Sequence, residues 1–173
     1  MLKHPSLALL LISGLCASAA CSRSESPGNV VDGEPGSASG EGDDASISKV
    51  RAGARALAQP GASVDYVADE MEGAIKARTK SQALMQYDGY RVTLTTPGDR
   101  VTTITFQLIE AKPTVKQLTD ELGEPEEARK GLLYTYESAA TGSTILILAE
   151  PVSMPANEDS LVRRIVIEGA RTR

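Results

Sequence analysis

Few side chains in this 173-residue sequence have the types and spacing that active-site chemistry requires. Ser46-Ile-Ser-Lys49 matches Ser-x-x-Lys, in which a lysine activates a serine nucleophile in penicillin-interacting enzymes. The sequence lacks the Lys-Thr-Gly and Ser-Asp-Asn motifs that accompany it there, and a match this short arises readily by chance. We therefore expect no catalysis at Ser46.

Clustered carboxylates could serve glycoside hydrolysis or bind a hard cation such as Ca²⁺. The candidates are Glu124, Glu126, Glu127, Glu158 and Asp159. The first three flank the predicted end of a helix, and the last two lie in a polar loop without the regular spacing of a calcium-binding loop. We expect solvated charge at both places, with no metal ion, no cofactor and no catalytic residue.

The other reactive residue types are confined to the N-terminus, where the only histidine is His4 and the only cysteines are Cys16 and Cys21. If this segment is removed as a leader, the working protein has no His-dependent triad, no thiol nucleophile, no disulfide and no His/Cys zinc site. We therefore predict a protein that is not an enzyme and acts by binding. An inhibitor or ligand-binding module and a carboxylate-based hydrolase are the alternatives.

Residues 1–20 have the pattern of a secretory signal peptide. Lys3 precedes an apolar stretch over residues 7–12, and small residues follow it. This stretch is too short to cross a hydrocarbon layer of ~30 Å, which takes roughly 20 apolar residues. The sequence thus predicts export.

Ser18-Ala-Ala-Cys21 resembles the lipobox of bacterial lipoproteins, although Ser18 stands where Leu is usual. The resemblance implies that Cys21 becomes a lipidated N-terminus, with a diacylglyceryl group on its thiol and an acyl chain such as palmitate on its amine. Several chains make such anchoring stable. Ser22 resembles the pattern of lipoproteins sent to the outer membrane, so we expect a periplasm-facing envelope lipoprotein. Ordinary cleavage after Ala17-Ser-Ala19 is the alternative.

Residues 21–48 are predicted to be the lipidated cysteine followed by a disordered tether. The tether has five glycines, and one basic residue against six acidic ones, so it buries too little apolar surface to offset its ordering entropy. Residues 49–173 carry sixteen Lys/Arg and seventeen Asp/Glu. The acidity of the chain therefore belongs to the tether, and the near-neutral domain gives no support for nucleic-acid binding.

Residues 49–173 are predicted to form an α+β globular domain. Apolar residues at helical spacing predict helices over residues 50–57, 64–75 and 114–122, with Ser63 capping the second and a Thr114–Gln117 capping box opening the third. Alternation predicts strands before Asp88-Gly89 and over 90–95, 103–108, Leu132–Tyr136, Thr144–Ala149 and Leu161–Ile167. We expect small antiparallel sheets with helices packed on one face, and hypothesise two related helix-plus-three-strand units.

The stretch Thr114-Val-Lys-Gln-Leu-Thr-Asp-Glu-Leu-Gly-Glu-Pro125, followed by Leu133-Tyr-Thr-Tyr136, resembles the SmpA/OmlA (BamE-type) outer-membrane lipoproteins. In that family a short helix ends in Leu-Gly-x-Pro and leads into an aromatic-bearing strand. This chain has no Trp, which the family often carries. The resemblance implies an accessory role in building or maintaining the outer membrane through protein contacts.

Four residues are predicted to contact a partner: Tyr134, Tyr136, Arg163 and Arg164. Aromatic and Arg side chains carry most of the binding energy in protein interfaces. The two arginines could instead guard an edge strand against aggregation. The expected partners are the membrane, through the lipid anchor, and proteins of the cell envelope.

Overall fold

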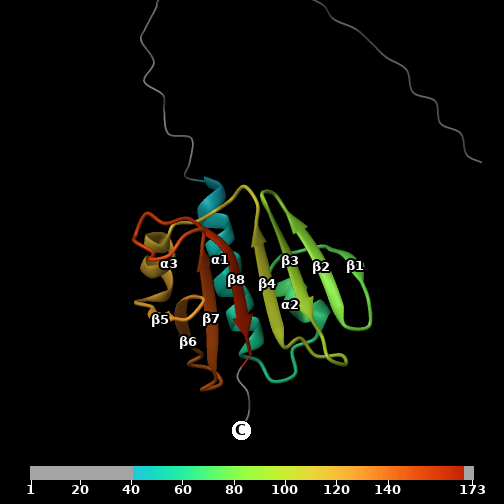
Figure 1. The fold of residues 1–173 in the computed structure, drawn as a ribbon. Coiled ribbons are helices and arrows are strands. Elements are labelled where there is room, and N and C mark those ends of the chain that lie inside the picture. The colour runs from blue at the N-terminus through green and yellow to red at the C-terminus, as the bar shows by residue number, and fades with distance from the viewer. Residues whose placement is uncertain (1–40, 170–173) are drawn as a thin grey trace, which may run out of the picture. The chain divides into compact units, whose positions relative to one another are not determined.

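The computed structural model describes residues 41–169, and the helices and strands below are those of this range (Figure 1). The helices are α1 (Glu41–Leu57), α2 (Val64–Glu70) and α3 (Val115–Leu122). The strands are β1 (Ile75–Arg78), β2 (Gln82–Tyr87), β3 (Tyr90–Thr95), β4 (Thr103–Leu108), β5 (Glu126–Ala128), β6 (Gly131–Glu137), β7 (Thr144–Pro151) and β8 (Val162–Glu168). The predicted signal peptide, Cys21 and most of the predicted tether lie outside the described residues.

All eight strands belong to one antiparallel sheet in the order β1-β2-β3-β4-β8-β7-β6-β5. β4 and β8, the last strands of the two halves of the chain, pair with each other and join the halves. The predicted fold class, small sheets with helices packed on one face, is therefore wrong: one large sheet dominates the fold.

Each half contributes four strands where three were predicted, because β1 and β5 were missed. The predicted second helix ran to Ile75, but α2 ends at Glu70, and Glu72 adopts a left-handed φ of 48° that turns the chain into β1. The three residues of β5 show no apolar alternation. Both missed strands are short edge strands, whose pairing depends on a neighbour and not on their own sequence pattern.

The local turn and cap signals are confirmed. The Tyr66 N–H donates to Ser63 Oγ at 3.2 Å, which caps α2. At α3 the Gln117 N–H donates to Thr114 Oγ1 at 3.2 Å, while the Thr114 N–H donates to Gln117 Oε1 at 2.8 Å. The predicted hairpin between β2 and β3 turns at Gly89, with φ 74°.

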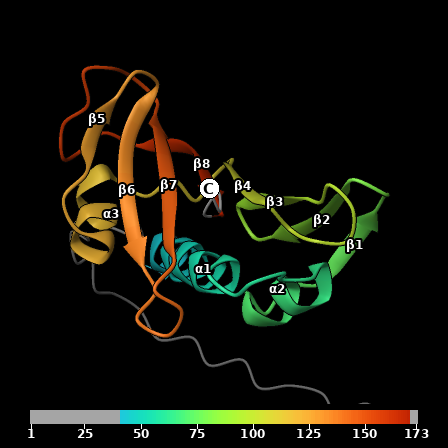
Figure 2. The same ribbon diagram turned by 90° about the horizontal axis from the view of Figure 1, so that it is seen from below.

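Helices α1 and α2 lie behind the sheet in Figure 1 and below it in Figure 2, with α1 running under β4, β8 and β7, while α3 lies beside β6. Gly53 of α1 makes this close seating feasible. A Cβ at Gly53 would lie 3.1 Å from Ile104 Cδ1 and 3.3 Å from Ile167 Cδ1, so a methyl group needs a small shift of these side chains and a side chain larger than Ala has no room. The core between α1 and the sheet also includes Val50, Ala54, Phe106, Ile147 and Ile165.

α1 begins at Glu41, ahead of the predicted domain start at Lys49. Ser46 and Ile47 are 0% and 3% exposed, so the first half of the helix packs against the rest of the domain. The hydrophobic core thus includes part of the segment that was predicted to be tether.

Candidate functional site

The sheet surface opposite the helices is uncovered by any described residue, and we call it the open face (Figures 1 and 2). The strand register aligns one row of side chains across it. From β2 to β6 this row consists of Leu84, Thr93, Thr105, Val166, Leu148 and Leu133. Every member is apolar or carries the Thr methyl group. Five of the six side chains are partly exposed, and Val166 is 9% exposed.

A polar row flanks this apolar row on one side, and a row that is polar except for Leu146 flanks it on the other. Toward one end of the strands the register aligns Arg91, Gln107, Arg164 and Glu150. Toward the other end it aligns Thr95, Thr103, Glu168 and Leu146, of which Leu146 is 42% exposed. The open face is therefore basic at one end of β8, acidic at the other and apolar between.

Arg163 and Arg164 both lie beside Glu150 because of an irregularity in the pairing of β7 with β8. Glu150 pairs with Arg164 and Pro151 with Val162, which leaves Arg163 without a partner on β7. Arg164 Nη1 lies 3.2 Å from Glu150 Oε1, and Arg163 Nη2 lies 4.0 Å from Glu150 Oε2. One carboxylate serves two guanidinium groups, so this corner of the open face carries excess positive charge. β8 is also an interior strand, so the edge-guard interpretation does not hold.

The two tyrosines predicted to contact a partner lie on the side of the helices. Tyr134 is fully buried, with its hydroxyl 3.3 Å from Thr119 Oγ1 of α3. Tyr136 is half-buried and lines a hollow of about 330 Å³ beside α1. The structure therefore brings the two arginines together but places the tyrosines on the opposite face of the sheet.

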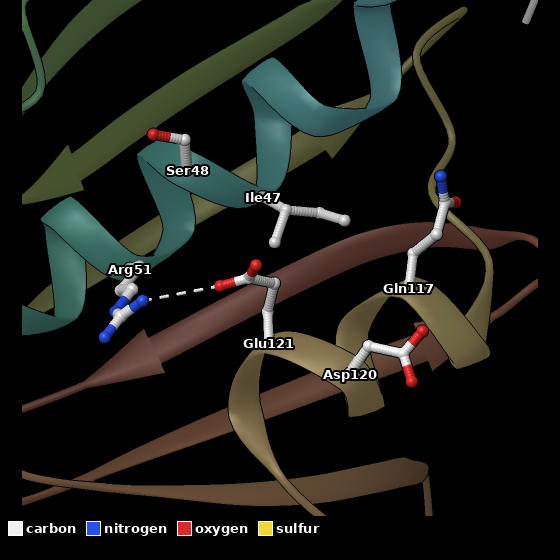
Figure 3. A pocket seen from close by; sticks show the side chains of 6 residues that line it. All are labelled: Ile47, Ser48, Arg51, Gln117, Asp120 and Glu121. Carbon is white, nitrogen blue, oxygen red and sulfur yellow. Dashed lines mark hydrogen bonds and ion pairs between the residues drawn. The ribbon is translucent and has the colours of Figure 1, made fainter. Parts of the chain in front are cut away.

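A second hollow, of about 440 Å³, lies between α1 and α3 (Figure 3). Its lining residues are Ile47, Ser48, Arg51, Gln117, Asp120 and Glu121. Figure 3 shows Arg51 reaching across to Glu121, with Arg51 Nη1 3.4 Å from Glu121 Oε2. Asp120 accepts a hydrogen bond from Lys116 at 2.8 Å. The charges around the hollow therefore already have partners within the domain.

The cations of α1 that flank these hollows all pair with acids from other elements. Lys49 donates to Glu72 after α2, Arg51 pairs with Glu121 of α3, and Arg55 Nη2 lies 2.9 Å from Glu70 Oε2 of α2. The hydrogen bond and charge of Lys49 lower the pKa of the exposed Glu72 carboxyl. Exposed pairs of this kind contribute only ~0–1 kcal/mol each.

The residues considered for chemistry are dispersed. Ser46 is buried within α1, and the Lys49 ammonium group is bound by Glu72. The candidate carboxylates are exposed at the end of α3, on β5 and in the loop before β8. Within residues 41–169, no three His, Cys, Asp or Glu side chains lie close enough to hold a metal ion.

Sequence reasoning missed the residues that make the open face apolar, which are Leu133, Leu146, Leu148 and Val166. The stretch Ile145-Leu-Ile-Leu-Ala149 signals them, because the residues that point to each face of this strand are all apolar. A half-exposed antiparallel strand ordinarily carries polar residues on its outer side. Apolar residues at both alternations therefore indicate either a fully buried strand or a surface that binds a partner.

Comparison with family models, with curated proteins and with solved structures finds no match for this chain. Among the described helices, none is long and apolar enough to cross a membrane. The leader sequence and the surfaces of the domain are therefore the features that bear on function.

Proposed function

We propose that this chain is an exported lipoprotein of the cell envelope, anchored through Cys21, whose domain works by binding a protein partner across the open face. The leader and the lipobox-like Ser18-Ala-Ala-Cys21 support the anchor. The resemblance to the SmpA/OmlA lipoproteins supports a role in assembling or maintaining the outer membrane. In this proposal the domain holds a partner and catalyses nothing.

One observation carries the binding role: apolar side chains adjoin one another on the uncovered side of three neighbouring strands. Leu133 of β6, Leu148 of β7 and Val166 of β8 are aligned by the register, and Leu146 extends the patch along β7. Contiguous apolar surface with a charged border is typical of protein interaction sites. A sheet face also suits a folded partner better than a small ligand, which requires a concave pocket.

The test is complementation of a deletion strain with charge placed on the open face. Leu146→Asp and Leu148→Asp should each impair envelope function while the protein keeps its normal level and melting temperature. Tyr66→Asp is the matched control, because Tyr66 is an exposed apolar residue (37%) on α2, away from the open face. Full function of both leucine variants, or equal loss with Tyr66→Asp, would argue against the open face.

A further inference from the structure

We propose that the open face is occupied by a second copy of this chain, in a face-to-face pair whose two-fold axis runs along the apolar row. This inference rests on the proposed function, because it names the partner that the open face binds. Three properties of the face support it: its charge pattern, its apolar row and its size.

The charge pattern selects the axis. On the open side of β8, Val166 lies midway between Arg164 and Glu168. Rotation about the apolar row exchanges the two ends of each strand, so Glu168 of one copy meets Arg164 of the other, twice per dimer. Rotation about an axis along the strands would instead place Arg164 on Arg164 and Glu168 on Glu168. Opposite charges across an interface stabilise it and like charges oppose it, so the first axis is favoured.

The same rotation makes the apolar row self-complementary. Residues on the axis meet their own counterparts, so Leu133, Leu148 and Val166 form symmetric apolar contacts. In a two-fold pair the same surface patch of both copies forms the interface. The apolar row can therefore bind its own counterpart. Two twisted sheets commonly pack face to face at about 30°, which keeps the central strands β4 and β8 in contact.

The open face is large enough for such a pair. Eight strands spaced ~4.8 Å apart and ~20 Å long present roughly 700 Å² of surface. A standard interface buries about 800 Å² per partner. The face therefore reaches the lower part of the range for a specific dimer, and a reversible pair is expected.

The pair is tested by disulfide trapping of the full chain in intact cells, with an added oxidant and a non-reducing gel. Leu148→Cys lies on the axis and should give a covalent dimer. Thr135→Cys, on the open face of β6 but off the axis, is the matched control and should give at least fivefold less. The chain without either substitution is a second control, which measures how much covalent dimer forms through Cys21 itself.

Charge reversals in the Leu148→Cys chain test the geometry. Glu168→Arg and Arg164→Glu should each lower the dimer yield at least threefold, and the two together should restore most of it, because they exchange the two charges that the rotation places opposite each other. Arg164→Glu also removes the ion pair with Glu150 inside each copy, and a melting temperature reports that effect separately. Lys80→Glu, in the exposed turn before β2, should change nothing, and melting temperatures verify that each variant is folded.

A Leu148→Cys yield no higher than that of Thr135→Cys would overturn the pair, as would a yield that charge reversal leaves unchanged. If Leu146→Asp still abolishes envelope function in that case, the open face binds a different protein and only the self-pairing fails. If Leu146→Asp has no effect although Leu148→Cys traps a dimer, the self-pairing holds and the envelope role fails.

Discussion

Ile104 of β4 and Ile167 of β8 are register partners at the seam where the two halves of the sheet join, and both contact the helix α1 at Gly53. The packing of α1 therefore depends on the same two isoleucines that lie where β4 meets β8. Without a side chain at Gly53, α1 lies directly on the two isoleucines and covers the line along which the halves meet. This junction is what makes one sheet out of two four-stranded hairpin arrays.

Substitution of Gly53 tests this close packing. Gly53→Leu should lower the free energy of unfolding by ~1–3 kcal/mol, because the added atoms overfill the contact with Ile104 and Ile167. Gly53→Ala is the matched control. Its Cβ needs only a small shift of two flexible side-chain ends, and helix propensity returns up to ~1 kcal/mol, so we expect a change near zero. Equal free energies of unfolding for the Leu and Ala variants, measured in urea, would contradict the close packing of α1 on the sheet.

The sequence predicted the local structure better than the way in which the strands combine. Ser63, Thr114–Gln117 and Gly89 act within a few residues, so their chemistry alone predicts the caps and the hairpin. The pairing of β4 with β8 joins residues some sixty positions apart, and no local sequence pattern specifies which strand β4 pairs with. The apolar spacing up to Ile75 likewise indicated helix, whereas Glu72 turns the chain into a strand.

Truncation tests where the domain begins. A chain starting at Lys49 loses Ile47, which is 3% exposed, and the first turns of α1, so it should be destabilised by ~2 kcal/mol or more. A chain starting at Glu41 keeps the whole helix and is the control. Chemical denaturation of both compares them directly. Equal stability would mean that the early part of α1 does not pack as described.

Three tyrosines make stability sensitive to alkaline pH. Burial, followed by the charge of Glu72, raises the pKa of Tyr87 to about 12, and burial also raises the pKa of Tyr90 and of Tyr134. Above pH ~10 the unfolded chain loses these protons while the folded chain keeps them. Stability should therefore be complete below that pH and fall as pH rises toward 12.

Tyrosinate absorbance and melting temperature, followed together, measure this effect. The three groups should titrate above the ordinary range and be released when the domain unfolds. Tyr87→Phe loses one ionisable group but also the hydrogen bond from the hydroxyl to the Met71 carbonyl at 3.1 Å. It should cost ~1 kcal/mol at pH 7 and flatten the alkaline fall. A melting temperature that stays constant between pH 9 and 12 would be inconsistent with buried tyrosines.

Cys21→Ser tests the proposed anchor. The substitution removes the thiol that takes the lipid, so the protein should move from the membrane to the soluble periplasmic fraction and lose lipid labelling. Ser22→Ala keeps the thiol and is the control for cleavage itself. An unmodified chain with the original thiol and an unacylated N-terminus would rule out the lipoprotein assignment.

Part of the candidate site followed from sequence and part did not. Arg163 and Arg164 were selected by residue type, and the structure places both on the open face beside Glu150. Tyr134 was selected for the same reason but lies in the core, because the face that a strand residue occupies depends on the register of its neighbours. The apolar patch around Leu148 was overlooked because its residues also satisfy the pattern of a buried strand.

The most direct test of the account asks which surface meets a partner in the cell. A photo-crosslinking residue at Leu146, on the open face, should give a discrete adduct in intact cells, and the same residue at Tyr66, on α2, should give none. Both positions are exposed to a similar extent, 42% and 37%, so unequal accessibility does not explain a difference. An adduct from Tyr66 with none from Leu146 would contradict the open face as the binding surface.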